Sequence, residues 1–207
     1  MLVGGLLRSP WPHARLRSVD VAEARAMPGI YAVLTGERYP TPFGVLPITH
    51  DETAIAVGKA RYEGDIIAAV AAADERTAER ALRAIRFEVE PLPEYPDPQT
   101  GLTKVAEPIH ARGLAGTNIQ KEVVQHFGDV DAAFAQARYR VRVRSSFAGV
   151  THAFTEPMAT IAEATPDGRL TVWSATQVPH YLHRALSEVL RIPMHRIRVI
   201  KPEVGGG

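Results

Sequence analysis

The sequence predicts an α/β (α+β) protein of two domains, each built from strands and helices that share one core. Short apolar runs bounded by glycine, proline or aspartate recur along the chain, which is typical of buried strands. Between these runs lie stretches whose apolar residues are three or four positions apart, the spacing of one helix face. A chain of 207 residues is long enough to bury a core in each of two domains.

The strands and the helix of the first domain follow from local patterns. Residues 29–35 and 65–72 are short and apolar and lie between turn-forming residues, which predicts two buried strands. Asp74 can cap a helix over about residues 75–86, because an aspartate side chain accepts hydrogen bonds from the first helical turn. A further strand is predicted at residues 87–90.

A proline-rich stretch then divides the chain. Four prolines fall within residues 91–98, and proline has no backbone N–H to donate to a helix or a strand. We therefore predict a first domain at residues 1–95, a linker at residues 96–122 and a second domain at residues 123–207.

The second domain is predicted to open with a short helix at residues 129–136, followed by a strand with two different faces. Apolar and basic residues alternate there, and a period of two is typical of a half-buried strand with a basic outer face. The apolar positions are Tyr139, Val141 and Val143, and the basic positions are Arg138, Arg140, Arg142 and Arg144.

The rest of the second domain reads as a hairpin, a helix and a strand. Strands are predicted at residues 158–164 and 170–175, joined by a Thr-Pro-Asp-Gly turn at residues 165–168. An amphipathic helix over about residues 179–190 and a strand at residues 196–201 complete the pattern. The buried face of this helix should comprise Leu182, Ala185, Leu186, Val189 and Leu190.

Composition and charge exclude several classes of function. The 24 basic and 23 acidic residues leave a formal charge of +1, which gives no global field to attract nucleic acid. The sequence has no cysteine, so it can form neither disulfides, thiolate zinc sites nor cysteine-ligated iron–sulfur clusters. No run reaches the roughly 18 apolar residues that span a bilayer. We therefore expect a soluble, cytoplasmic protein without a membrane span.

A first candidate site precedes the predicted hairpin, in the segment His-Ala-Phe-Thr-Glu-Pro. His152 and Glu156 are four residues apart and could bind a metal or move protons, and Phe154 lies between them. Loop residues before a strand often face a cleft. The alternative is that the pair only caps the strand or hydrogen-bonds the backbone.

A second candidate is Gln177, which lies where a buried strand passes into a helix. A neutral amide at such a junction can both donate and accept hydrogen bonds to a ligand, or it can simply cap the helix. His180 and His183 share a helix face, but no carboxylate is in register with them, so a solvated or packing role is favoured over metal binding.

A third candidate is the glycine triplet at the end of the sequence. Glycines after a strand let the backbone approach a neighbour closely, and their N–H groups could face an anionic cofactor. The spacing matches no nucleotide-binding fingerprint, and a flexible tail is the alternative. Because such a loop needs a continuation, we expect the chain to be the first part of a longer subunit. The three residues are Gly205, Gly206 and Gly207.

Taken in order, the motifs of residues 1–95 resemble the hammerhead domain of the large subunits of the xanthine dehydrogenase and aldehyde oxidase family. The matching segments are Leu7–Pro10, Pro12–Arg15, Pro28–Thr35, Arg61–Asp65 and Phe87–Pro93. The second domain is similar to the start of the molybdenum-cofactor domain of that family, in His152–Pro157, Ala175–His180 and Val204–Gly207. Within the family, Thr155–Met158 and Gln177–Tyr181 most resemble the molybdenum subunit of 4-hydroxybenzoyl-CoA reductase.

This resemblance implies a molybdenum–pterin cofactor, as molybdopterin or its cytosine dinucleotide, with iron–sulfur clusters and FAD on partner subunits. Gln177 would hydrogen-bond an oxygen ligand of molybdenum, and no residue here would bind the metal directly. The cofactor loop would comprise Gly205, Gly206 and Gly207, and the substrate-pocket candidates would be His152, Phe154 and Glu156.

The implied reaction is reductive dehydroxylation of an aromatic CoA thioester, and the alternatives are the xanthine, aldehyde and carbon monoxide dehydrogenase types. The glutamate that the family places near the metal is missing, so the catalytic set would be incomplete and the chain inactive alone. The alternative from a different class of function is a non-catalytic module that only contacts other subunits.

Overall fold

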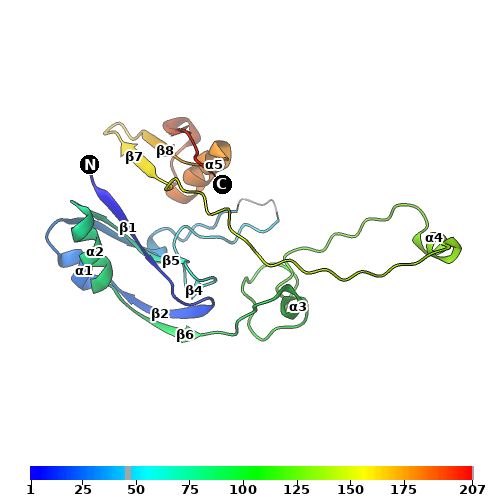
Figure 1. Cartoon of the computed structure of the whole chain (residues 1–207). Helices are drawn as coiled ribbons and strands as arrows, with labels where there is room; N and C mark the ends of the chain where they lie inside the picture. The colour runs from blue at the N-terminus through cyan, green and yellow to red at the C-terminus, as the bar shows by residue number, and fades with distance from the viewer. Residues whose placement is uncertain (45–47, 207) are drawn as a thin grey trace.

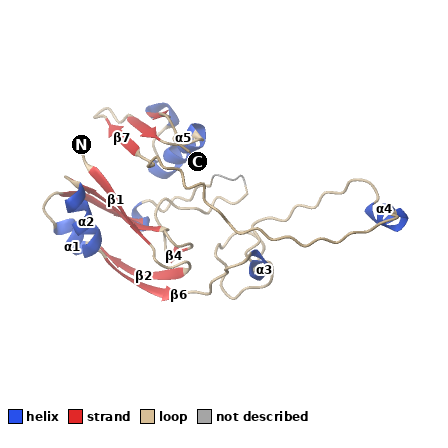
Figure 2. Cartoon of the chain, viewed as in Figure 1, coloured by secondary structure: helices blue, strands red, loops and turns tan. Residues whose placement is uncertain are grey.

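The computed structural model of the chain describes residues 1–44 and 48–206. Figures 1 and 2 show two regions of strands and helices, from which a long arm projects. The first region contains β1 Val3–Arg8, β2 Ala14–Asp20, α1 Ala22–Ala26, β3 Ile30–Thr35, β4 Lys59–Ala60, β5 Ile66–Ala72, α2 Glu75–Ala84 and β6 Arg86–Pro91. The rest of the chain contains α3 Pro98–Gly101, α4 Val130–Gln136, β7 Thr160–Ala164, β8 Leu170–Ser174, α5 Pro179–Leu190 and β9 Ile197–Ile200.

The first region is built on two three-stranded sheets, in the orders β1-β5-β3 and β4-β2-β6. All ladders in these sheets are antiparallel. Helix α2 packs against β1 and β5, and α1 packs beside α2 and β3. Helix α2 begins where the sequence predicts, because the Asp74 side chain accepts a hydrogen bond of 2.8 Å from the Thr77 N–H.

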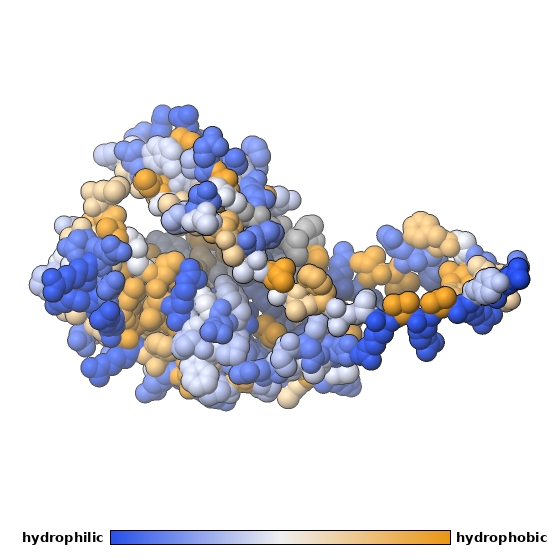
Figure 3. Space-filling view, viewed as in Figure 1, coloured by the Kyte–Doolittle hydropathy of each residue, from blue (hydrophilic) through white to orange (hydrophobic). Residues whose placement is uncertain are grey.

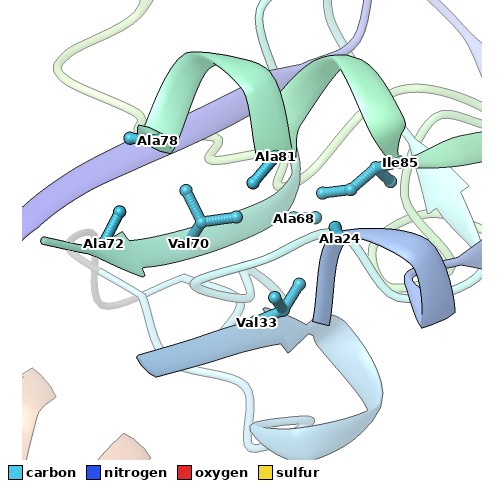
Figure 4. Close-up of a cluster of buried hydrophobic side chains, with 8 residues drawn as sticks. All are labelled: Ala24, Val33, Ala68, Val70, Ala72, Ala78, Ala81 and Ile85. Atoms are coloured by element: carbon cyan, nitrogen blue, oxygen red, sulfur yellow. The ribbon is translucent and has the colours of Figure 1, made fainter. Parts of the chain in front are cut away.

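Small side chains form much of the core beneath α2 (Figure 4). Ala78 and Ala81 of the helix are buried against the sheet, which lets the helix approach closely. Gly5 of β1 continues this close packing, because a Cβ there would lie 3.1 Å from side-chain atoms of both Leu82 and Val70. The buried members of the cluster are Ala24, Val33, Ala68, Val70, Ala72, Ala78, Ala81 and Ile85.

A third sheet, in the order β7-β8-β9, forms the C-terminal region. Strands β7 and β8 form an antiparallel hairpin, whose turn contains Gly168 at a φ of 81°. Strand β9 runs parallel to β8, and α5 makes the crossover between them. Leu170, Val172 and Ile197 are the buried centre of this region, and α5 packs on them through Leu186 and Leu190.

The structure confirms the predicted strands β3, β5, β6, β7, β8 and β9 and the helices α2, α4 and α5, with ends that shift by a few residues. Strands β1, β2 and β4 and helices α1 and α3 are found where the sequence analysis predicted no element. The face of α5 that was predicted to be buried is only half-buried, because the sheet covers it and no second layer does.

The predicted strand at residues 138–144 is wrong. This segment lies in the arm, which we define as residues 121–150, and it has no strand assignment. Tyr139, Val141 and Val143 are exposed by 76%, 85% and 79%, so neither face is buried. A strand requires a neighbour to accept and donate its backbone hydrogen bonds, and no described strand runs beside this segment.

Residues 96–112 lie against the first region. Glu107 accepts a hydrogen bond from Lys59 Nζ at 2.7 Å and lies 3.4 Å from Nη2 of Arg15. The Tyr95 hydroxyl donates to the Glu107 backbone carbonyl at 2.9 Å. The assignment of residues 96–122 as a linker stays a prediction. Within the described ranges, no helix combines the length and the apolar character needed to cross a membrane.

Candidate functional site

A hollow of about 330 Å³ lies at one edge of the third sheet. Sheet topology explains which segments meet there. Strands β8 and β9 are parallel, so the residues that follow them emerge at the same edge, and the residues that precede antiparallel β7 start from that edge. The hollow is lined by Phe154, Glu156, Pro157, Met158, Ala175, Glu203, Val204, Gly205 and Gly206.

Two glycines are required by the close packing of this edge. A Cβ on Gly205 would overlap the side chain of Glu156, and a Cβ on Gly206 would lie 2.8 Å from Cγ of Phe154. Side chains at either position would therefore displace the segment before β7. The structure thus brings together two of the sequence candidates before the hairpin and two of the terminal glycines. Gly207 lies outside the described residues.

Gln177 follows β8 and comes two residues after Ala175, which lines the hollow. Its side chain is exposed, and it is not itself among the lining residues. The Gln177 side chain does not cap α5, which was the alternative role for it. The N-cap of α5 is Val178, and its N–H donates a hydrogen bond of 3.2 Å to Oγ1 of Thr176. The Gln177 amide therefore remains available to a ligand near the edge of the hollow.

His152 is not brought into the hollow. It is exposed and does not line the cavity, and no ion pair joins it to Glu156 within the described residues. Glu156 does line the hollow, and the neighbouring Thr155 hydroxyl donates to its carboxylate at 3.4 Å. The predicted pair is thus split, and only its acidic member faces the cavity.

The two histidines of α5 have different environments. Nε2 of His183 lies 2.9 Å from the Met194 carbonyl oxygen and 3.1 Å from that of Ile197, so it donates a shared hydrogen bond to both. His183 therefore ties α5 to the start of β9. His180 is exposed. Among the described residues, no group of three or more potential ligands is placed to hold a metal ion.

The sequence analysis missed a larger cavity of about 520 Å³ in the first region. Oδ2 of Asp51 lies 3.1 Å from Nδ1 of His110, and Oδ2 of Asp65 accepts the Arg61 N–H at 3.1 Å. Burial raises the pKa of the Asp65 carboxyl, and the hydrogen bond from Arg61 acts against that effect. The spacing of Arg61 and Asp65 was the available signal. It gave no indication of His110, which is distant in sequence.

Two known families match the chain, and together they cover most of it. Residues 1–93 match the family described as the aldehyde oxidase and xanthine dehydrogenase a/b hammerhead domain. Residues 114–207 match the family described as the molybdopterin cofactor-binding domain.

Among curated relatives, the chain is 34% identical to the putative xanthine dehydrogenase molybdenum-binding subunit of Escherichia coli, over 97% of this chain and 28% of that subunit. It is 37% identical to the nicotinate dehydrogenase large molybdopterin subunit of Eubacterium barkeri, over 100% of this chain and 48% of that subunit. The chain therefore spans less than half the length of each.

Solved structures agree with these relatives. Quinoline 2-oxidoreductase from Pseudomonas putida 86 superposes with a TM-score of 0.82 at 30% identity, covering 100% of this chain and 27% of that one. The Cu,Mo-CO dehydrogenase superposes with a TM-score of 0.82 at 27% identity, covering 100% of this chain and 28% of that one.

Proposed function

The chain carries the hammerhead and molybdopterin cofactor-binding domains of the xanthine dehydrogenase and aldehyde oxidase family, and from this premise we propose that its third sheet forms one wall of a molybdenum–pterin site. The proposed wall is the hollow around Gly205 and Gly206, with Gln177 at its edge. The observation that carries the proposal is the glycine segment folded against Phe154 and Glu156.

The residues present fit such a group. Gly205 and Gly206 have no room for a Cβ, so their backbone lies bare along the hollow, where N–H groups can meet the anionic part of a cofactor. Gln177 adds an amide that brings no charge of its own, and its side chain does not cap α5, because the N-cap is Val178 and no side-chain hydrogen bond caps that end. The lining also offers apolar surface from Phe154.

Each residue has a specific proposed role. Gln177 would donate an amide N–H to the cofactor, and Gly205 and Gly206 would allow it to approach the backbone. Phe154 and Glu156 would fix the position of the glycine segment, because they fill the space that glycine side chains would need. When bound, the cofactor supplies two-electron oxidation or reduction of an electron-poor carbon, which no side chain here can perform.

For the substrate, we propose a small electron-poor organic molecule, with electrons passed through iron–sulfur and FAD subunits. The support is that relatives bear the names xanthine, nicotinate and carbon monoxide dehydrogenase. The narrower resemblance to 4-hydroxybenzoyl-CoA reductase stays a prediction from the sequence around Glu156 and Gln177, and so does the aromatic CoA thioester that it implies as substrate. A cytosine dinucleotide form of the cofactor stays a prediction as well.

The test is the cofactor content of the protein purified with its natural partners. Molybdenum is measured by mass spectrometry and pterin by fluorescence, in the unaltered protein and in Gly206→Ala. Forcing a side chain into filled space costs about 1–3 kcal/mol. We therefore expect the affinity of the protein for the cofactor to fall about tenfold, and the molybdenum content to fall with it. Gly149→Ala is the matched control, because a Cβ on Gly149 meets nothing within 4 Å.

Two outcomes would contradict the proposal. Equal molybdenum content in Gly206→Ala and Gly149→Ala would show that the hollow does not hold the cofactor. A stable complex of the unaltered protein that contains neither molybdenum nor pterin would instead favour a non-catalytic module that contacts other subunits. Gln177→Ala tests the amide separately, and an unchanged molybdenum spectrum would remove Gln177 from the site.

A further inference from the structure

The segment that follows the first region is folded on itself. In Figure 1 it lies between β6 and the arm, with α3 at its start, and Figure 3 shows its surface joined to that of the first region. The Asn118 N–H donates to the Gly101 carbonyl at 3.2 Å, and the Asn118 side-chain oxygen accepts the Ile109 N–H at 2.8 Å. Residues 101–119 therefore form a compact loop whose two ends lie together, which we call the clasp loop.

One carboxylate of the clasp loop reaches two cations of the first region. Oε1 of Glu107 accepts a hydrogen bond of 2.7 Å from Nζ of Lys59, and its Oε2 lies 3.4 Å from Nη2 of Arg15. Nζ of Lys59 also donates to the Pro108 carbonyl at 2.8 Å, so this side chain holds two consecutive residues of the loop. The hydrogen bond from Lys59 is the main reason that the pKa of Glu107 is lowered, which keeps the carboxyl ionised at neutral pH.

The two cations that Glu107 joins are direct neighbours in a sheet. Arg15 of β2 lies opposite Lys59 of β4 in their antiparallel ladder, and like charges at opposed positions destabilise a strand pair. Strand β4 has only two residues to hold its place. Glu90 offsets part of the charge, because its Oε2 lies 3.7 Å from Nε of Arg15. Among the described residues, Glu107 is the one carboxylate within 4 Å of Nζ of Lys59.

Other contacts of the clasp loop reach a different part of the first region. Nδ1 of His110 lies 3.1 Å from Oδ2 of Asp51, and Arg112 donates to the His50 carbonyl at 2.8 Å. Residues 50 and 51 lie in no strand or helix, whereas Lys59 belongs to a sheet. The contact at Lys59 is therefore the one that links the loop to a sheet of the first region.

We propose that the clasp loop is a charge-dependent lock, in which Glu107 docks between Arg15 and Lys59 and joins the segment between the two domains to the first domain. The second domain then starts from a fixed point near residue 120 instead of from a free linker. The Lys59 and Glu107 side chains are 16% and 31% exposed, so solvent screens their attraction less than that of a fully exposed pair. This proposal does not depend on the cofactor site.

The test is amide hydrogen exchange of the full chain, measured by mass spectrometry in the unaltered protein and in Glu107→Gln. This substitution removes the charge and keeps the shape of the side chain. We expect amides within residues 105–118 to exchange about tenfold faster, a change of about 1.4 kcal/mol in the opening equilibrium, because a hydrogen bond between charged groups is lost. Amides of α2 should keep their rate, because the opening is local.

Charge makes a second prediction that packing alone does not make. In Glu107→Gln the amides of residues 14–16 and 58–60 should also exchange faster, since Arg15 and Lys59 then lie opposite each other without an anion between them. Adding Arg15→Met removes one of the two repelling cations. In the double variant these strand amides should return toward their original rate, while the clasp loop stays fast because its anchor is still missing.

Glu88→Gln is the matched control, because it removes one charge from an exposed side chain of β6 in the same sheet. It should leave the exchange of the clasp loop unchanged. The proposal is overturned if Glu107→Gln matches this control, or if Arg15→Met does not slow exchange at residues 58–60 in the Glu107→Gln chain. Faster exchange in α2 of Glu107→Gln would also overturn it, since the contact would then support the whole first region and not a local lock.

Discussion

At the scale of single residues, His13 is the clearest case of a titratable group shaped by its surroundings. Its side chain is 3% exposed, and its Nδ1 lies 2.6 Å from the Pro93 carbonyl oxygen. A carbonyl can only accept, so Nδ1 carries the hydrogen and Nε2 presents a lone pair. Nε2 is buried and has no partner among the described residues. Burial is the main reason that the pKa of His13 is lowered.

This arrangement predicts a specific pH dependence of stability. A histidine with a lowered folded-state pKa takes up its proton first in the unfolded state, so its contribution is present above about pH 6.5 and is lost as pH falls below it. We expect the unfolding free energy to drop between pH 7.5 and pH 5, and to drop less in His13→Gln. Urea denaturation at the two pH values measures both.

His126→Gln is the control for this prediction, because His126 is exposed in the arm. It should show the same pH dependence as the unaltered chain. If His13→Gln also keeps the full drop, the pH dependence arises from other groups and the neutral state of His13 contributes nothing to it.

At the scale of elements, the end of α5 is held in a conformation that its residue does not favour. Arg191 at the C-cap adopts the left-handed conformation, with a φ of 57° and a ψ of 36°. Most helices that end in this way use glycine, since a Cβ is crowded there. The following Pro193 and the contact of α5 with β9 keep the chain in this turn.

Arg191→Gly is therefore expected to stabilise the chain by about 1 kcal/mol, because glycine adopts positive φ without steric cost. Thermal unfolding measured by circular dichroism checks this. Arg184→Gly is the comparison within the same helix: it places glycine in the helix interior and removes the contact with Tyr181, and should destabilise by about 1 kcal/mol. A lower melting temperature for Arg191→Gly would refute the strain argument.

At the scale of the whole molecule, burial is divided unevenly. The first region has a core of eight buried apolar residues, and the third sheet has three. The first region is also tied to residues that follow it, through the contacts of Glu107 with Lys59 and Arg15. The arm has no buried residue. Local opening should therefore cost least in the arm and most in the first region.

Limited trypsin digestion should follow this order. We expect the first cuts after the arginines between residues 138 and 144, because the protease needs an extended, accessible segment. Cuts after Arg80 and Arg83 of α2 should come much later, since that helix packs on the sheet. Mass spectrometry of fragments over time measures the order. Early cleavage within α2 would show that the first region is not the stable part.

Local patterns determined the elements whose signals are complete within a few residues. The short apolar run of β5, the Asp74 cap of α2 and the turn at Gly168 each indicate a conformation without reference to distant residues. The same reasoning failed for residues 138–144. A period of two shows that a segment could be a strand, but it does not show whether a second strand lies beside it. It also missed β1, whose two glycines gave a weak strand signal, although one of them, Gly5, allows α2 to pack closely.

The amino-acid sequence alone determined the type of fold, the order of most strands and helices, and which residues have the chemistry to meet a cofactor. Only the tertiary structure decided that Glu156 and Phe154 lie against Gly205 and Gly206 while His152 does not, and that none of the described strands pairs with residues 138–144. The physical reason is range: turns, caps and periodicity act between residues close in the chain, whereas a shared sheet edge joins segments about fifty residues apart.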